Sequence, residues 1–466
     1  MMKNKLAYLL ILVITTSSLT SCFSDQDDEI QPASTLEIQD FVWRGLNIFY
    51  LYKEDIPALD ESNYASQAEL DNFLDNYANP EDLFDALMSS QDRFSFIVSD
   101  YTVLEDALAG TSKSNGMEYG LVQLQSTGEV FGYVRYVLPD TDAEDKGVER
   151  GMIFNRVDGT AITTENYSSL LASTTYTIGL ASFENSTLTE LEETISLTKS
   201  EYTEDPVYIA KTIELADKNV GYLMYNAFNN NFDNTLNNAF ANFKGEGITD
   251  LVIDLRYNGG GSIETSNDLA SMVTGQFNGE LFTTQVYNEN FDDVERLFNN
   301  EVSTGATINS LNLNKVYILT TGSTASASEL IISSLLPYIE VVQVGTTTTG
   351  KFQGSVTLYD SADFSRSDAS INHKYAMQPL ILKTVNANGY TDYVDGITPS
   401  IIVEEDYANL GVLGDVNEPL LAAALNDASL GRFATDSNKS DLEFKEIGES
   451  DMNTLNYQRM YINDIK

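Results

Sequence analysis

Two loops of this 466-residue chain combine residue types that can carry out acyl transfer. Glycines 259–261 follow the apolar segment 251–255. A glycine run lets the backbone approach a ligand closely and aims bare N–H groups at a developing oxyanion. The Gly-x4-Gly-Lys-Ser/Thr spacing of a phosphate loop is absent. Ser326 stands before a second apolar segment, where helix N–H groups and the positive dipole end favour the same charge.

A lysine follows at the position where a base is needed. Lys351 comes 25 residues after Ser326 and follows the apolar segment 341–344, so its amine can return to the same edge of a sheet. A lysine acts as a general base when burial lowers its pKa from about 10.4 toward 7 or 8. The residues favour a Ser326–Lys351 dyad. The alternative is that Ser323, Thr324 and Ser326 serve only as helix caps.

Composition narrows the chemistry further. A Ser-His-Asp triad would have to use His373, the single histidine, and the single cysteine leaves neither a disulfide nor a cysteine-based zinc site. We therefore expect no metal and no cofactor. The chain has 70 acidic and 26 basic residues, a net charge of −44, which disfavours nucleic-acid partners. Hydrophobic residues make up 42% and indicate a globular protein of two or three domains.

The two loops lie in a region where strand and helix patterns alternate. Such an order indicates an α/β core with largely parallel pairing and right-handed crossovers, in which sites lie at the carboxyl ends of strands. We expect strands at 220–225, 251–255, 316–320 and 341–344, and helices at 232–243, 270–273 and 327–336.

Two further regions precede this core. Ser34 and Glu37 have capping-box spacing, and Pro80 opens another helix, so the first region is helical. The second consists of short strands, and its segment 147–159 resembles part of a PDZ domain, with a hairpin closed by an Asp-Gly pair. Ser196 and Lys199 fit the Ser-x-x-Lys pattern, but the alternation of apolar residues around them favours a strand over the helix which that motif needs.

The first 22 residues predict an export signal. Two lysines precede an apolar stretch and a small-residue run that ends at Cys22, which is typical of a secretory signal peptide. The four residues 19–22 resemble the lipobox of bacterial lipoproteins, so we expect Cys22 to carry a lipid anchor. The ordinary alternative is a cleaved signal with a coincidental cysteine. We expect a cell-envelope lipoprotein, in the outer membrane and facing the periplasm or the surface.

The catalytic motifs resemble those of the C-terminal processing (tail-specific) serine peptidase family. Its Asp-Leu-Arg-x-Asn-x-Gly-Gly motif is found at 254–261, its Ser-Ala-Ser-Glu motif at 326–329 and its Gly-Lys motif at 350–351. The resemblance covers residues 35 to 430 and implies a crotonase/ClpP-like α/β core, an inserted PDZ-like β-rich module and an N-terminal helical domain. The expected divisions are a signal peptide (1–21), a linker with the helical domain (22–110), the PDZ-like module (111–203), the peptidase core (204–430) and a polar tail (431–466).

The resemblance also assigns roles to residues. It implies that Ser326 attacks a peptide carbonyl, that Lys351 is the base, and that backbone N–H groups of Ala327 and of Gly260 or Gly261 form the oxyanion hole. Many family members carry a glutamine four residues after the lysine, where this chain has a serine; Gln353, two residues after it, is the candidate to orient the lysine.

The implied activity is cleavage of polypeptides near their C-termini, with the PDZ-like module binding the substrate's free C-terminus. A non-catalytic peptide-binding or scaffolding lipoprotein of the same fold is the alternative function. Glycan binding is a weaker one. The sequence does not indicate an oligomeric state.

Overall fold

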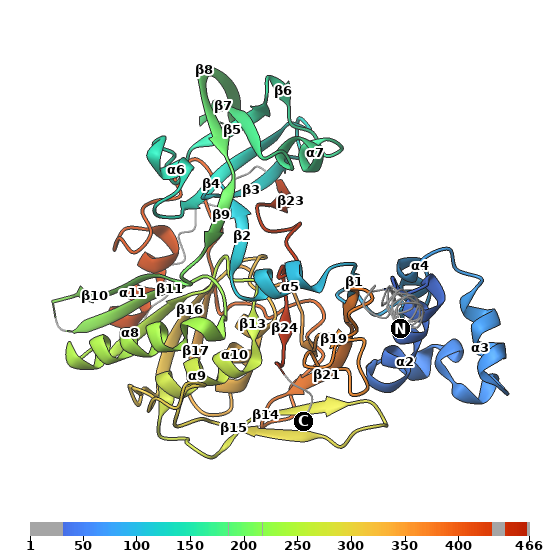
Figure 1. Cartoon of the computed structure of the whole chain (residues 1–466). Helices are drawn as coiled ribbons and strands as arrows, with labels where there is room; N and C mark the ends of the chain where they lie inside the picture. The colour runs from blue at the N-terminus through green and yellow to red at the C-terminus, as the bar shows by residue number, and fades with distance from the viewer. Residues whose placement is uncertain (1–30, 185, 217, 431–442, 464–466) are drawn as a thin grey trace, which may run out of the picture.

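The computed structural model describes residues 31–184, 186–216, 218–430 and 443–463. The predicted signal peptide and Cys22 lie outside these residues. A central α/β core carries a β-rich module at the top of Figure 1, and a group of N-terminal helices packs at its right. Among the described residues, no helix is both long enough and apolar enough to cross a membrane.

The core is built on a six-stranded sheet. Its strands from β11 to β22 pair in parallel, and β10 adds an antiparallel edge, which confirms the predicted α/β core. Across the sheet the order is β10 (Val207–Glu214), β11 (Asn219–Tyr225), β12 (Asp250–Asp254), β16 (Lys315–Thr320), β17 (Glu340–Gly345) and β22 (Ile401–Ile402).

Helices cover both faces of this sheet (Figure 1). Alternate side chains of β12 point to opposite faces: Leu251 and Ile253 join the larger apolar cluster, and Val252 joins a second cluster with Leu420 of the C-terminal helix. The helices are α8 (Asp233–Gly245), α9 (Ile263–Thr274) and α10 (Ala327–Leu335), which contribute to the larger cluster, and α11 (Pro419–Leu430), which contributes to the second.

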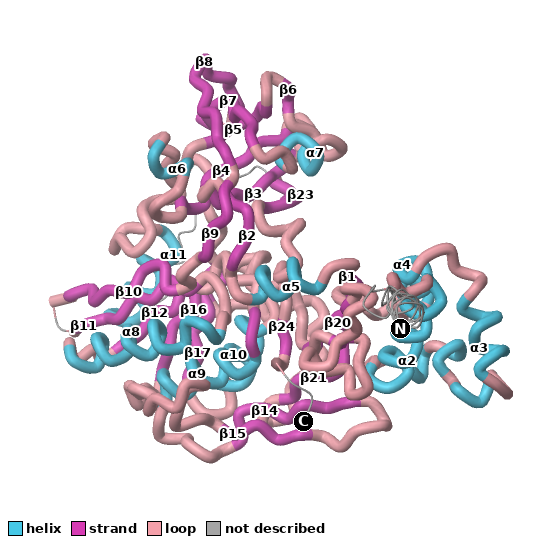
Figure 2. The backbone as a smooth tube through the Cα atoms, viewed as in Figure 1, coloured by secondary structure: helices cyan, strands magenta, loops and turns pink. Residues whose placement is uncertain are grey.

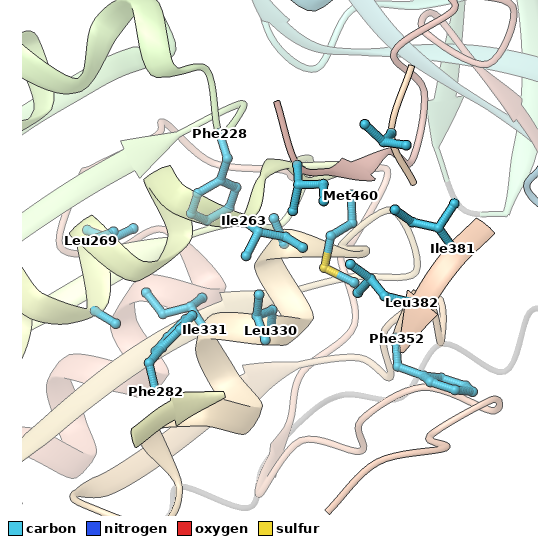
Figure 3. Packing of buried hydrophobic residues seen from close by; sticks show 14 of the residues in the cluster. Phe228, Ile263, Leu269, Phe282, Leu330, Ile331, Phe352, Ile381, Leu382 and Met460 are labelled. Atoms are coloured by element: carbon cyan, nitrogen blue, oxygen red, sulfur yellow. The ribbon is translucent and has the colours of Figure 1, made fainter. Parts of the chain in front are cut away.

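A second six-stranded sheet lies beside the first and was not predicted. Several of its strands have only two or three residues, too few to give a period-2 pattern. Its order is β13 (Gly261–Ser262), β24 (Met460–Tyr461), β18 (Gln353–Ser355), β21 (Leu380–Val385), β14 (Leu281–Tyr287) and β15 (Val294–Leu297). Figure 3 shows its inner face, where Met460 lies beside Ile263 and Leu382 in the larger apolar cluster.

The β-rich module is a twisted sheet with two short helices. Asp158 and Gly159, with φ of 48° and 77°, form the predicted hairpin turn between β5 and β6, and Ser196 lies in a strand as expected. The strands are β3 (Met117–Leu124), β4 (Val130–Val137), β5 (Ile153–Val157), β6 (Thr160–Ala161), β7 (Thr175–Glu184), β8 (Thr187–Thr198) and β23 (Phe444–Glu449), with helices α6 (Asp142–Asp145) and α7 (Tyr167–Leu171); β2 (Thr111–Ser114) and β9 (Ser200–Thr203) pair below the module.

The N-terminal region is helical, as predicted. Ser34 caps the first helix in a capping box with Glu37, and Asn79 accepts a hydrogen bond from Asp82 N ahead of Pro80. Its helices are α2 (Thr35–Phe49), α3 (Gln67–Leu74), α4 (Pro80–Ala86) and α5 (Tyr101–Leu108), with single 3₁₀ turns η2 (Lys53–Asp55), η3 (Pro57–Leu59) and η4 (Glu61–Asn63). Strand β1 (Phe96–Val98) pairs with β20 (Ala376–Gln378), which in turn pairs with β19 (Leu358–Tyr359). In the core, the 3₁₀ turn η5 (Asn230–Phe232) precedes α8.

The C-terminal segment, residues 443–463, differs from the polar tail that its sequence predicted. It provides β23 to the module and β24 to the core, and Figure 2 shows both strands on one path from the module to the core. Its strands are short and flanked by polar residues, so their pairing partners, far away in the sequence, decide their structure.

Candidate active site

The glycine loop lies directly beside Ser326. A Cβ placed on Gly260 would lie 2.6 Å from Ser326 Cβ and 3.0 Å from Ala327 N, so only glycine fits between the loop and the start of α10. Gly260 also has a φ of 112°, which L side chains rarely adopt. The structure therefore brings together the two loops that the sequence analysis singled out.

Ser326 occupies a strained position at the N-terminus of α10. Its φ is 67° and its ψ is −117°, which for a residue with a side chain costs about 1–3 kcal/mol. Its side chain is fully buried, and Oγ has no hydrogen-bond partner among the described residues. Ser326 is also the N-cap residue of α10, and a buried hydroxyl without a partner on a strained backbone is typical of a reactive group.

Glu329 joins the serine to the lysine loop, and the sequence analysis did not assign it a role. Its carboxylate accepts hydrogen bonds from Ser326 N at 2.7 Å, Lys351 N at 2.8 Å, Gly350 N at 2.7 Å and Thr348 Oγ1 at 2.5 Å. Burial raises the pKa of Glu329, although these four donors oppose the shift. The one sign of this role in the sequence was the place of Glu329 at the end of the Ser-Ala-Ser-Glu motif.

Lys351 has the environment that a general base requires. Its side chain is fully buried, and Nζ lies 4.6 Å from the centroid of the Phe94 ring. Burial lowers the pKa of the amine well below its usual range; the guanidinium of Arg459 lowers it further, while Asp92 and Glu329 oppose the shift. Nζ donates a hydrogen bond to Gln458 O at 2.8 Å, so the amine is engaged by the C-terminal segment.

The three backbone donors expected in the oxyanion hole differ in their partners. Gly260 N donates to Asn258 Oδ1 at 2.8 Å within the loop, and Gly261 N donates to Arg459 O at 2.5 Å. Ala327 N borders the same space beside Gly260. Gly260 N and Gly261 N therefore both have partners, the first within its own turn and the second in the C-terminal segment.

Gln353 lies elsewhere than the expected lysine-orienting position. It is buried on β18 and donates from Nε2 to Tyr52 Oη at 2.8 Å, and its Oε1 has no partner among the described residues. The described contacts of Lys351 Nζ do not include it. Its spacing from Lys351 on an extended strand suggested Gln353 as the partner that orients the lysine. In the structure the backbone carbonyl of Gln458 accepts the hydrogen bond from Lys351 Nζ instead.

The single histidine lies away from these groups. His373 Nε2 pairs with Asp360 Oδ2 at 3.0 Å, and its ring packs 6.0 Å from that of Phe41 in α2. Within the described residues, no group of three or more His, Cys, Asp and Glu side chains could hold a metal ion.

A buried ion network fixes the glycine loop to the sheet. Arg256 is fully buried and pairs with Asp254 at 2.8 Å and with Glu418 of the loop before α11 at 2.7 Å. Tyr222 on β11 donates to Asp254 Oδ2 at 2.7 Å. These contacts tie the residues before the glycine loop to β11 and to the loop before α11.

Two family models match the chain. The model described as peptidase family S41 covers residues 219–402, which contain the glycine loop, Ser326, Glu329 and Lys351. The model of the peptidase S41 N-terminal domain covers residues 37–96. The chain belongs to peptidase family S41. The residues between the two S41 matches hold the β-rich module.

Solved structures agree with this S41 assignment. A Bacteroides fragilis NCTC 9343 structure assigned to the S41 proteases is 27% identical, covers 84% of this chain and 97% of that one, and has a TM-score of 0.66. The photosystem II D1 C-terminal processing protease, 21% identical with a TM-score of 0.50 over 84% of this chain and all of that one, shares the fold.

Curated relatives match a smaller part of the S41 chain. A CtpA-like serine protease of Staphylococcus epidermidis is 29% identical over 213 residues, which is 45% of this chain and 39% of the relative. The chain thus matches about two fifths of that relative's length.

Proposed function

We propose that this protein is a serine endopeptidase in which Ser326 and Lys351 form the catalytic dyad. The observation that carries the proposal is the Ser326–Glu329–Lys351 unit: one buried carboxylate holds the backbone of both residues beside the glycine loop. Membership of family S41 supports the same reaction class.

In the proposed mechanism, Lys351 is neutral because burial lowers its pKa, and its Nζ takes the proton of Ser326 Oγ. Oγ attacks the peptide carbonyl, whose oxygen gains negative charge facing the backbone N–H of Ala327 and that of Gly260 or Gly261. One such donor contributes about 10²–10³ in rate. The Lys351 ammonium then protonates the leaving amine, and water hydrolyses the acyl-enzyme with Lys351 again as base.

We also propose that the β-rich module is a PDZ-like unit that binds the C-terminal part of a polypeptide substrate. The edge of β3 accepts an added strand, β23, in antiparallel register, which is how PDZ domains bind peptides. Cleavage near the substrate's C-terminus follows if the module delivers that end to the core.

The cellular location is a separate proposal. The lipobox-like sequence at 19–22 favours lipidation of Cys22 and anchoring in the cell envelope, with the outer membrane as the expected site. Cells fed labelled palmitate should label the wild-type chain and leave Cys22→Ser unlabelled. Equal labelling of both would contradict the anchor.

The peptidase proposal is tested with an unstructured protein such as casein. Lys351→Met keeps the apolar packing and removes the base, so cleavage should fall at least about a hundredfold. Lys315→Met is the matched control: Lys315 is partly exposed and pairs with Asp427 and Glu340 in the core sheet, and the variant should cleave at the wild-type rate. Unchanged cleavage by Lys351→Met would refute the dyad, and peptide binding without cleavage by the wild type would favour a scaffolding role.

A further inference from the structure

The last strand among the described residues lies between the segments that follow the glycine loop and Lys351. β24 is inserted between β13, which continues the glycine loop, and β18, which follows Lys351. Met460 pairs with Gly261 in parallel register, and Ile462 N donates to Ser355 O at 3.0 Å. Met460 is fully buried beside Ile263 in Figure 3. A segment from the far end of the sequence thus joins the two loops that hold the catalytic groups.

The same segment accepts hydrogen bonds from Lys351 and from the glycine loop. Gln458 O accepts the hydrogen bond from Lys351 Nζ, and Arg459 O accepts the one from Gly261 N. Ser326 Oγ has no partner among the described residues. The proposed base and a candidate oxyanion donor are therefore both engaged by backbone carbonyls of the chain itself.

The first strand of the segment lies on the peptide-binding edge of the module. β23 pairs antiparallel with β3 from Phe444 to Glu449. Ile447 packs into the module's apolar cluster, and a Cβ on Gly448 would lie 3.0 Å from the ring of Tyr167 in α7. A strand added between a sheet edge and a helix is the strand-addition mode of peptide recognition.

Arg135 of β4 connects the segment to the core between these two strands. Its buried guanidinium pairs with Glu446 at 2.5 Å and with Glu449, and donates to Ser323 Oγ at 3.0 Å, three residues before the nucleophile. A cavity of about 150 Å³ lies beside the segment and is lined by both Gly260 and Glu449. The segment therefore runs without a break from the module to the catalytic groups.

We propose that residues 444–462 are a tethered inhibitory occupant of the substrate path, defined as the β3 edge together with the gap between β13 and β18. The inference rests on the proposed peptidase function and extends it. A polypeptide substrate binds as an added strand at the same two places, and cleavage requires that the segment leave them. Because the occupant is covalently attached, it competes at an effective concentration that a free peptide does not reach.

A reversible disulfide lock between β3 and β23 tests this proposal. Gln123 and Lys445 face each other across β3 and β23, where opposite residues lie about 4.5–5.5 Å apart and suit a disulfide. In the full chain with Cys22→Ser, the pair Gln123→Cys and Lys445→Cys can form only that bond. We expect the oxidised form to cleave casein at least about tenfold more slowly than the same protein after reduction.

The matched control is a disulfide that leaves the segment free. Thr175 and Thr198 are exposed and face each other across β7 and β8 of the module. Thr175→Cys with Thr198→Cys, again with Cys22→Ser, should cleave equally well before and after reduction. Equal rates for the two forms of the Gln123–Lys445 lock would overturn the proposal.

A second variant moves the activity in the opposite direction. Ile447→Asp places a charge where the segment packs on the module, so the segment should dissociate more often and casein cleavage should rise severalfold. Ile371→Asp, at a side chain that is 76% exposed, is its control and should leave the rate unchanged. No rise with Ile447→Asp would count against the proposal. Absence of cleavage in the wild type, the reduced lock and Ile447→Asp alike would instead refute the peptidase function itself.

Discussion

At the scale of single residues, the site combines two features that cost stability. Ser326 has a positive φ, and Lys351 buries an amine without a carboxylate in direct contact with Nζ among the described residues. Sequence alone was enough to single out both residues, because their types and spacing are local properties. It could not find the role of Gln458, since that contact depends on how a distant segment folds back.

The buried amine makes a prediction about stability and pH. The folded-state pKa of Lys351 lies below its unfolded value, so the unfolded chain binds more protons and the free energy of unfolding rises with pH across that interval. Lys351→Met removes this dependence. The melting temperature of Lys351→Met relative to wild type should therefore be higher at pH 6 than at pH 10. The same difference in melting temperature at both pH values would show that folding does not lower the pKa of the Lys351 amine.

At the scale of elements, the site depends on the hydrogen bonds between the Glu329 carboxylate of α10 and residues 348–351 of the loop before β18, here called the clamp. The periodic segments β11, α8, β12, β16, α10 and β17 were predictable from sequence because each has five or more residues with a clear apolar pattern. The clamp was not predictable from sequence, because residues 348–351 form no regular element and their positions are set by hydrogen bonds to Glu329. The strands β13, β18 and β24 escaped prediction for a related reason: they are too short to show a pattern.

Replacing the clamp's carboxylate tests this arrangement. Glu329→Gln leaves one acceptor oxygen for four donors, and its amide group opposes a backbone N–H, so about 1–3 kcal/mol of stability should be lost. Because the clamp aligns Ser326 with Lys351, kcat should fall by about tenfold or more while KM changes little. Chemical denaturation and steady-state kinetics measure the two effects. A loss of stability with unchanged kcat would assign Glu329 a purely structural role.

At the scale of the whole molecule, three regions meet around Ser326 and Lys351. The N-terminal region supplies Phe94 against Lys351, the core supplies the glycine loop and the loops of Ser326 and Lys351, and the C-terminal segment links the core to the module through Arg135. The fold class, the helical N-terminal region and the β-rich module were predictable from the sequence because each shows in local periodicity or in a family resemblance. The path of the C-terminal segment was not, because it is fixed by pairings such as Gly261 with Met460.

Helix α10 offers a matched comparison for the proposed cleavage of polypeptides by Ser326. Ser326 and Ser334 lie at its two ends, and both have buried hydroxyls without a partner among the described residues. The measurement is the rate of casein cleavage by Ser326→Ala and Ser334→Ala. We predict a loss of at least about ten-thousandfold for Ser326→Ala and a wild-type rate for Ser334→Ala. Cleavage by Ser326→Ala at the wild-type rate would contradict this prediction.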